Sequence, residues 1–201
     1  KVSYDQLYDE HVFIFGSLSV QSVFDKYDLT LVECEPQLTH GGSMRYTIMH
    51  KESAVISESV GRILLQEKAS GLDDVTTYLN FGRNCEIRKS ELVHLLKGLK
   101  EEGRKVAGYA ATSKSTTVLN YCNIDSSLIT YISDSTKEKI GTFTPGSNIP
   151  VISHEEMRLN PPDYLVLFAW NHEKEILAKE LGILDSNVKW IRFVPKVEIV
   201  K

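Results

Sequence analysis

The chain has only three cysteines among its 201 residues, and Cys34, Cys85 and Cys122 lie far apart. None of them stands in C-x-x-C spacing, so the sequence contains neither a zinc-binding pattern nor a disulfide framework. We therefore expect reduced thiols that pack as small buried hydrophobes, no metal site, and a cytoplasmic protein.

Long apolar runs and dense runs of one charge are also missing. No segment approaches the roughly 20 apolar residues of a membrane-spanning helix, and the polar start of the chain does not read as a signal peptide. Lys and Arg number 23 against 27 Asp and Glu, for a net charge of −4. A basic stripe for nucleic acid is therefore not evident, and we expect neither a nucleic-acid nor a membrane partner.

The most informative stretch is 105–124. A short apolar strand, 105–107, leads into a small-residue loop, 108–114, and an apolar-periodic helix follows. Small side chains let the backbone approach a ligand, and a helix N-terminus directs unpaired N–H groups at an anion. We expect binding residues at Gly108, Tyr109, Ala110, Lys114, Thr116 and Thr117. With one glycine the loop matches no phosphate-binding motif, so a tight turn without a ligand is the alternative.

Strands and helices alternate from residue 105 to the end of the chain. We expect strands at 105–107, 128–132, 150–153, 164–169 and 190–194, and helices near 154–158 and over 171–181, the last closed by Gly182. This alternation predicts an α/β fold with a Rossmann-like, mostly parallel sheet and helices on both faces. Ligands bind beyond the carboxyl ends of such strands, which adds Asp134, Trp170 and Asn171 as candidates.

The first half of the chain reads differently. We expect a helix over 17–27 with Ser17 or Ser19 as its N-cap, and strands at 29–34 and 44–49 around the turn 39–42. A helical arm follows to Gly103, broken at 71–73, with Asp73 or Asp74 capping its second part. We therefore predict a helix-plus-hairpin remnant of a second α/β domain at 1–51, the arm at 52–104 and the Rossmann-like domain at 105–201. Because the chain begins at Lys1 rather than Met, we expect a piece of a longer protein.

A second candidate site is the loop 8–11. His11 stands beside Glu10 and near Tyr8, and such a histidine can act as a general base. Neighbours on an extended loop point apart, so Glu10 need not be the partner of His11. A purely structural histidine is the alternative, because a lone histidine is more often structural than catalytic. The turn around His40 can likewise be only a tight hairpin, because its glycines suit positive φ. His50, His94 and His154 lie among surface-like charges and carry no functional signal.

Seven stretches, in order, resemble the sugar C-methyltransferase family, whose members use S-adenosylmethionine to methylate a ring carbon of nucleotide-linked keto-deoxysugars. They are 4–11, 39–45, 71–74, 108–123, 145–150, 162–164 and 170–171. Each is weak alone, but together they are specific and span nearly the whole chain.

This resemblance implies an N-terminal zinc domain, a central S-adenosylmethionine domain and a C-terminal Rossmann-like domain that helps hold the sugar nucleotide, of which a dTDP-linked sugar is the expected kind. The present chain resembles the end of the central domain plus the C-terminal one. By similarity His11 is the general base, with Tyr8 and Glu10 in the same motif, and Tyr8 or His40 stabilises the oxyanion of an enolate that attacks the sulfonium methyl. The resemblance also adds Pro145 and Gly146 to the binding residues. The family usually has glycine where this chain has Ala110.

Two other functions stay open at this point. A dinucleotide-binding oxidoreductase domain of NAD type would use the loop 108–114 and place a ribose on Asp134. A binding or assembly module without catalysis would use the same fold with no ligand in the loop.

Overall fold

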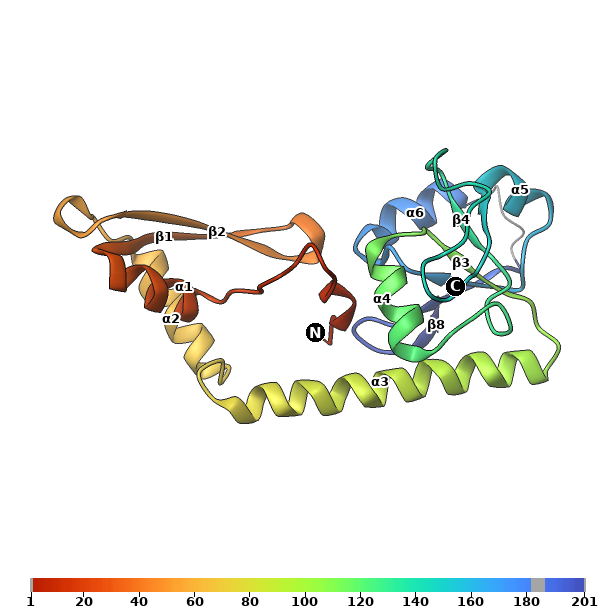
Figure 1. The fold of residues 1–201 in the computed structure, drawn as a ribbon, viewed down its shortest axis with the longest axis horizontal. Helices are drawn as coiled ribbons and strands as arrows, with labels where there is room; N and C mark the ends of the chain where they lie inside the picture. Colours follow the sequence, from red (N-terminus) through yellow and green to blue (C-terminus); the bar gives the residue numbers. More distant parts are fainter. Residues whose placement is uncertain (1, 182–186, 201) are drawn as a thin grey trace. The chain divides into compact units, whose positions relative to one another are not determined.

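The computed structural model describes residues 2–181 and 187–200 and divides the chain into two compact units (Figure 1). The sheet unit combines Lys1–His11 with Arg83–Lys201, and the hairpin unit is Val12–Gly82. These borders follow packing. The domain borders expected at residues 51 and 104 refer to the family's domains and stay a prediction.

The hairpin unit packs two helices against a two-stranded antiparallel sheet. Its elements are α1 (Ser17–Phe24), η2 (Asp25–Tyr27), β1 (Leu29–Gln37), η3 (Thr39–Gly41), β2 (Ser43–His50), η4 (Lys51–Ser53) and α2 (Glu58–Ala69). Helix α1 begins after Gly16 rather than at a serine cap, because the Glu67 carboxylate accepts hydrogen bonds from the amides of Ser17 and Leu18 at 2.6 and 2.9 Å. A carboxylate from α2 thus replaces the expected local cap.

The long helix α3 (Val75–Glu101) begins in the hairpin unit and ends in the sheet unit. Asp74 caps it, as predicted, by accepting a hydrogen bond from the Thr76 amide at 2.8 Å. The helix ends before Gly103, whose φ of +72° suits a residue without a side chain.

The sheet unit contains a six-stranded sheet in the order β5-β4-β3-β6-β7-β8. Its elements are η1 (Tyr4–Gln6), β3 (Val106–Tyr109), α4 (Ser113–Cys122), β4 (Ile132–Asp134), β5 (Val151–Ser153), α5 (His154–Leu159), β6 (Tyr164–Leu167), η5 (Trp170–His172), α6 (Glu173–Glu180), β7 (Lys189–Arg192) and β8 (Glu198–Val200). All neighbouring strands are parallel except β7 and β8. The predicted α/β fold with a mostly parallel sheet is confirmed.

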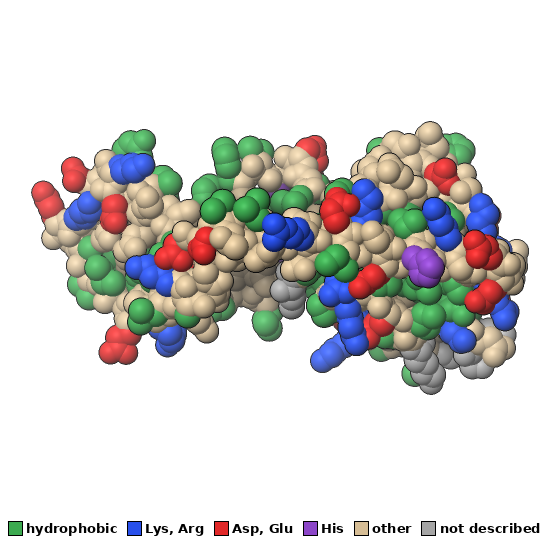
Figure 2. Space-filling model, turned by 90° about the horizontal axis from the view of Figure 1, so that it is seen from below, with side chains coloured by type: hydrophobic (Ala, Val, Ile, Leu, Met, Phe, Trp, Pro, Cys, Tyr) green, Lys and Arg blue, Asp and Glu red, His purple; other side chains and the backbone are tan. Residues whose placement is uncertain are grey.

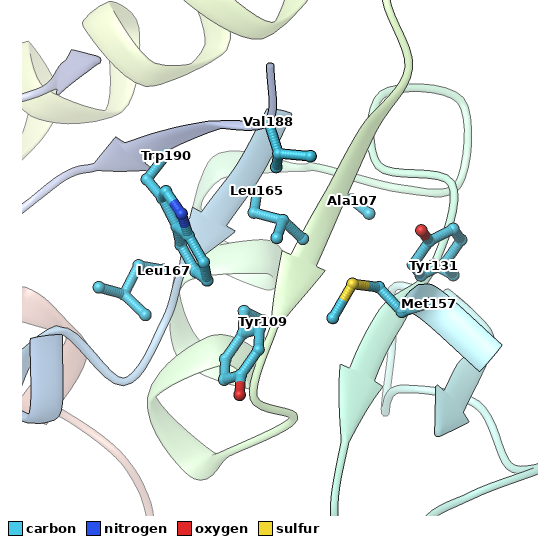
Figure 3. Close-up of a cluster of buried hydrophobic side chains, with 8 residues drawn as sticks. All are labelled: Ala107, Tyr109, Tyr131, Met157, Leu165, Leu167, Val188 and Trp190. Carbon is cyan, nitrogen blue, oxygen red and sulfur yellow. The ribbon is translucent and has the colours of Figure 1, made fainter. Parts of the chain in front are cut away.

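Buried side chains of β3, β6 and β7 form a hydrophobic cluster on one face of this sheet (Figure 3). Ala107, Leu165 and Trp190 belong to it, and Met157 of α5 packs among them. Along β3 and along β6, every second side chain belongs to this cluster, which is the expected period of two for a strand.

Some boundaries differ from prediction. Strand β4 begins at Ile132 rather than Leu128, because the amides of Leu128 and Ile129 turn back to the Asp125 carbonyl at 3.1 Å. The helix predicted over 171–181 is a 3-10 turn followed by α6, and the expected stop at Gly182 lies outside the described residues. The final strand is shifted to Lys189–Arg192, and the antiparallel β8 was not predicted.

Candidate functional site

The order of the strands defines where a ligand can approach. From β3 the chain proceeds to β4 and β5 on one side, and it returns to the other side of β3 as β6. The carboxyl ends of β3 and β6 therefore form the topological switch point, where open α/β sheets place their ligand crevice. The loop 110–112 and the segment 168–172 lie there.

The loop after β3 is shorter than predicted. Gly108 and Tyr109 belong to β3, and Lys114 lies in the first turn of α4. A side chain at Gly108 would put its Cβ 2.7 Å from Phe168, so this glycine permits close packing rather than contact with a ligand. The Tyr109 ring is buried, and its hydroxyl donates to Glu180 at 2.7 Å.

The side chain of Asp134 holds the loop 110–112 in place. This carboxylate accepts hydrogen bonds from the amides of Ala111 and Thr136 at 2.7 and 2.8 Å. Burial acts to raise the pKa of Asp134, but the bonds from Thr136, the charge of Lys139 and the Ala111 amide lower it overall. Lys139 also donates to the Ala111 carbonyl at 2.6 Å. Asp134 therefore fixes the loop, and each of its two oxygens already accepts a hydrogen bond from a backbone amide.

The N-terminus of α4 borders a cavity of about 300 Å³. Thr112 and Ser115 cap the helix reciprocally, each hydroxyl accepting from the other's amide. The cavity brings together the predicted residues Thr116 and Pro145, with Lys139 and the hydroxyl residues Thr142 and Thr144 on its wall.

The predicted residue Gly146 shapes the turn beside this cavity. Its φ is +76°, and any Cβ there would collide with the Asn120 side chain. Asn120 in turn donates to the Pro145 carbonyl at 3.0 Å. Gly146 thus allows α4 and the turn to approach each other.

A second cavity of about 300 Å³ contains the predicted residues Tyr109, Ala110 and Asp134. His154, read from sequence as a surface residue, is instead 6% exposed and stacks on the Tyr109 ring with centroids 4.4 Å apart. Burial lowers the pKa of His154, so the neutral imidazole is favoured. That surface interpretation was wrong, because the charges near it in sequence belong to the exposed side of the short helix α5.

A buried polar cluster joins the start of the chain to the switch point. Asp5 is fully buried, and the Trp170 indole Nε1–H donates to its Oδ2 at 2.6 Å. Lys114, 7% exposed, donates to Asn171 Oδ1 at 2.9 Å, and its Nζ lies 5.1 Å from the centre of the Trp170 ring. The predicted residues Lys114, Trp170 and Asn171 are thus brought together, with Asp5 as a partner not predicted.

The segment after Asp5 carries the predicted base. The Thr117 hydroxyl donates to the Leu7 carbonyl at 3.2 Å, which places this segment against α4. His11 is exposed, its Nδ1 lies 2.8 Å from the Gln6 carbonyl, and its ring centroid lies 4.0 Å from that of the half-buried Tyr8. A carbonyl can only accept, so in the neutral imidazole this geometry assigns the proton to Nδ1 and the lone pair to Nε2.

The other predicted catalytic residues are Glu10, the chain neighbour of His11, and His40. Glu10 is exposed. His40 lies in the turn of the hairpin unit, with φ of +54°, followed by Gly41 and Gly42 at +85° and +132°. This geometry is the tight hairpin turn that the glycines suggested, and joint action of His40 and His11 stays a prediction.

Sequence reasoning missed a buried ionic group beneath the second cavity. Glu180 accepts two hydrogen bonds from Arg158, at 2.6 and 2.9 Å, besides the one from Tyr109. Asp5 was also missed, although a carboxylate inside the aromatic stretch 4–8 was the available signal. Partners 22 and 165 positions away cannot be inferred from local pattern.

Several whole-chain features bear on the class of protein. Cys34, Cys85 and Cys122 are all buried and free, as predicted. In residues 2–181 and 187–200, no helix has the length and apolarity needed to cross a membrane, and no three His, Cys, Asp or Glu side chains are grouped to hold a metal ion. On the face drawn in Figure 2, acidic and basic side chains are interspersed.

Comparison with known proteins agrees with the resemblance seen in the sequence. Residues 38–195 match the family described as the C-methyltransferase C-terminal domain. The chain is also 30% identical over 200 residues to the C-methyltransferase NovU of Streptomyces niveus, covering 98% of this chain and 47% of that protein. It thus spans about half the length of the curated relative it matches. Because the family match covers most of its length, the chain belongs to the C-methyltransferase C-terminal domain family.

Proposed function

We propose that this chain is the C-terminal portion of an S-adenosylmethionine-dependent C-methyltransferase that acts on a ring carbon of a nucleotide-linked keto-deoxysugar. Family membership and the similarity to NovU support the C-methyltransferase class. The substrate class and the residue roles rest on the motif resemblance and on the contacts of the sheet unit.

The observation that carries the proposal is the hydrogen bond between His11 Nδ1 and the Gln6 carbonyl. It selects the neutral tautomer with the proton on Nδ1, in which Nε2 of an exposed imidazole carries the lone pair. A proton on the carbon next to a ketone is acidic enough for such a base when the developing enolate oxygen is stabilised. In this role Nε2 takes the α-proton, and the C–H electrons move into the carbonyl to form the enolate.

Tyr8 is suited to stabilise that enolate oxygen. Its ring lies against the His11 ring. Burial raises the pKa of Tyr8, and the charges of Glu10 and Asp5 raise it further. The phenol therefore stays protonated near neutral pH and can donate a hydrogen bond to an oxyanion. His40 keeps the same role only as a sequence-based alternative.

The cavity beside α4 suits the diphosphate of a nucleotide sugar. The helix N-terminus, the Lys139 ammonium and the hydroxyls of Thr116 and Thr142 border one space. Positive charge, a helix dipole and hydroxyl donors are the groups that bind phosphate oxygens. Thymidine diphosphate, the nucleotide expected from the resemblance, is the natural probe.

S-adenosylmethionine itself does not fit the loop after β3. Such adenosyl cofactors need close backbone approach and a free acid for the ribose hydroxyls. Here Gly108 is covered by Phe168, and Asp134 is engaged with the amides of Ala111 and Thr136. These residues are therefore not suited to hold the cofactor. The same contacts give no support to the dinucleotide-binding alternative.

The test is His11→Asn in the complete polypeptide that contains this chain. Loss of the base should lower kcat by about 10²- to 10⁴-fold, while the affinity for the sugar nucleotide, measured by calorimetry, stays unchanged. His94→Asn is the matched control, because His94 is an exposed residue of α3 outside the site. Unchanged turnover in His11→Asn would remove this histidine from the role of base.

A further inference from the structure

We propose that Asp5 is a positioning residue that fixes the orientation of His11 by anchoring the turn η1 to Trp170 at the carboxyl end of β6. This inference rests on the proposed function of His11 as a base, and it concerns a residue that no motif assigned.

The first step of the argument is the anchor itself. Asp5 is fully buried, and Trp170 donates a 2.6 Å hydrogen bond to it across 165 positions of sequence. A buried carboxylate is costly unless it is paired and hydrogen-bonded. Burial raises the pKa of Asp5, although the Trp170 hydrogen bond and the charge of Lys114 act to lower it. Asn171 accepts from that ammonium at 2.9 Å. In the part of the chain that the structure describes, Oδ1 of Asp5 has no hydrogen-bond partner. The bond between Asp5 and Trp170 therefore ties the start of the chain to the segment after β6.

The second step connects the anchor to the base. Asp5 lies in the three-residue turn Tyr4–Gln6, so fixing its carboxylate fixes the neighbouring Gln6 carbonyl. That carbonyl receives the His11 Nδ1–H at 2.8 Å. The amide of His11 donates to the Tyr8 carbonyl, also at 2.8 Å, which keeps the loop compact. The contacts that link Trp170, Asp5, Gln6 and His11 therefore fix the imidazole relative to the segment that follows β6.

The third step is the consequence for catalysis. A general base must hold its free nitrogen within hydrogen-bond reach of the proton it removes. His11 is exposed, and its ring is contacted by the Gln6 carbonyl and the Tyr8 ring, both in the segment that Asp5 anchors. Loss of the anchor should let the turn move, and a misplacement of about 1 Å can cost roughly 100-fold in rate. Binding of the diphosphate in the cavity beside α4, lined by Lys139, Thr116 and Thr142, should be affected much less, because these residues are not part of the anchor.

The test compares Asp5→Leu with Asp5→Asn in the complete polypeptide. Leucine has the same branched shape and the same number of side-chain heavy atoms but no acceptor, so kcat should fall about 10- to 100-fold with KM for the sugar nucleotide unchanged. Asparagine keeps an oxygen for the Trp170 indole and should retain most of the activity. Tyr4→Phe is the matched control, because it removes the 3.6 Å Tyr4–Cys122 contact from the same turn without touching the anchor.

A spectroscopic readout keeps the inference testable apart from turnover. The Trp170 indole N–H and the His11 imidazole signals should shift in Asp5→Leu and stay in place in Tyr4→Phe, with Trp190 as internal reference. If Asp5→Leu does not fold, Trp170→Phe removes the same hydrogen bond and should give the same loss of kcat. If the wild type is active and these variants keep its kcat and its His11 signals, the proposed anchor is wrong. A wild type without methyl transfer contradicts the proposed function instead, and the His11 signals then decide the anchor alone.

Discussion

Ala110 is held in a conformation that its side chain disfavours. Its φ is +75°, and its amide donates to the Ser133 carbonyl at 2.8 Å, so the strand end and the loop impose this geometry. The left-handed region costs an L-residue with a Cβ about 1–2 kcal/mol, whereas glycine adopts it freely. The family resemblance places glycine at this position, and the structure explains why.

Ala110→Gly should therefore stabilise the sheet unit. The relief of strain exceeds the added entropy of the unfolded chain, and we expect a gain of about 0.5–1 kcal/mol in the free energy of unfolding. Urea titration followed by tryptophan fluorescence measures this directly, because Trp170 and Trp190 both belong to the sheet unit. Ala178→Gly, at an exposed position of α6, is the control and should lose about 0.5–1 kcal/mol. A loss in Ala110→Gly would mean that the loop is not strained.

At the scale of elements, Glu180 ties α6 to α5 and β3. Its side chain is 2% exposed and accepts from Arg158 and Tyr109. Burial acts to raise the pKa of Glu180, but the hydrogen bonds from Arg158 and Tyr109 outweigh it and lower that pKa below 4.5. Burial raises the pKa of the Tyr109 phenol, which donates one of the hydrogen bonds to Glu180.

Glu180→Gln should destabilise the sheet unit by about 2–4 kcal/mol at neutral pH, because the amide keeps an acceptor but removes the buried charge that pairs with Arg158. A lowered folded pKa means that this contribution is fully present above the unfolded pKa, near 4.5, and is lost as pH falls through the folded value. The difference between wild type and variant in urea titrations should therefore be constant above about pH 5.5 and shrink below about pH 4.5.

Two controls make this test specific. Glu175→Gln removes an exposed carboxylate of the same helix, 3.2 Å from His172, and should change stability by less than about 0.5 kcal/mol. The second control compares Glu180 with Glu180→Gln in a His154→Phe background. This background removes the imidazole that stacks on Tyr109 and titrates in the same network. A difference that persists undiminished at pH 3 would show that the Glu180 charge is not what stabilises the contact.

The elements that the sequence predicts best are those whose burial pattern is local. Strand β6 stands out as a continuous apolar run because both of its faces are covered, and α3 is marked by Asp74 and Gly103 at its ends. Strand β8 has three residues, one of them charged, and only its pairing with β7 makes it a strand. The same limit applies to the site. Lys114, Trp170 and Asn171 were found from strand ends, while Asp5 and Glu180 depend on partners that folding alone brings near.

At the scale of the whole molecule, the residues of the proposed function are divided between the two units. His11, Lys114 and the cavity beside α4 all lie in the sheet unit, whereas His40 lies in the hairpin unit. The binding of a nucleotide diphosphate is therefore a property that we expect from the sheet unit by its own contacts. Since both tryptophans report on that unit, ligand-linked stability can be followed without interference from the hairpin unit.

Thymidine diphosphate should raise the midpoint temperature of thermal unfolding of the sheet unit, followed by tryptophan fluorescence. A ligand that binds only the native state at about 100 times its Kd adds about 2.7 kcal/mol, which corresponds to a rise of roughly 5–10 °C for a protein of this size. Lys139→Met should abolish most of the shift, because this ammonium borders the cavity. Lys97→Met, at an exposed position of α3, is the matched loss of charge and should leave it intact.

Nicotinamide dinucleotide provides the opposing measurement. It should produce no shift, because the crevice lacks the glycines and the free acid that such a cofactor needs. A large shift with the dinucleotide and none with thymidine diphosphate would favour an oxidoreductase domain. A flat response to both at millimolar concentration would instead indicate that the loop after β3 carries no ligand, and the sugar-nucleotide proposal for this cavity would then fail even if His11 proved to be a base.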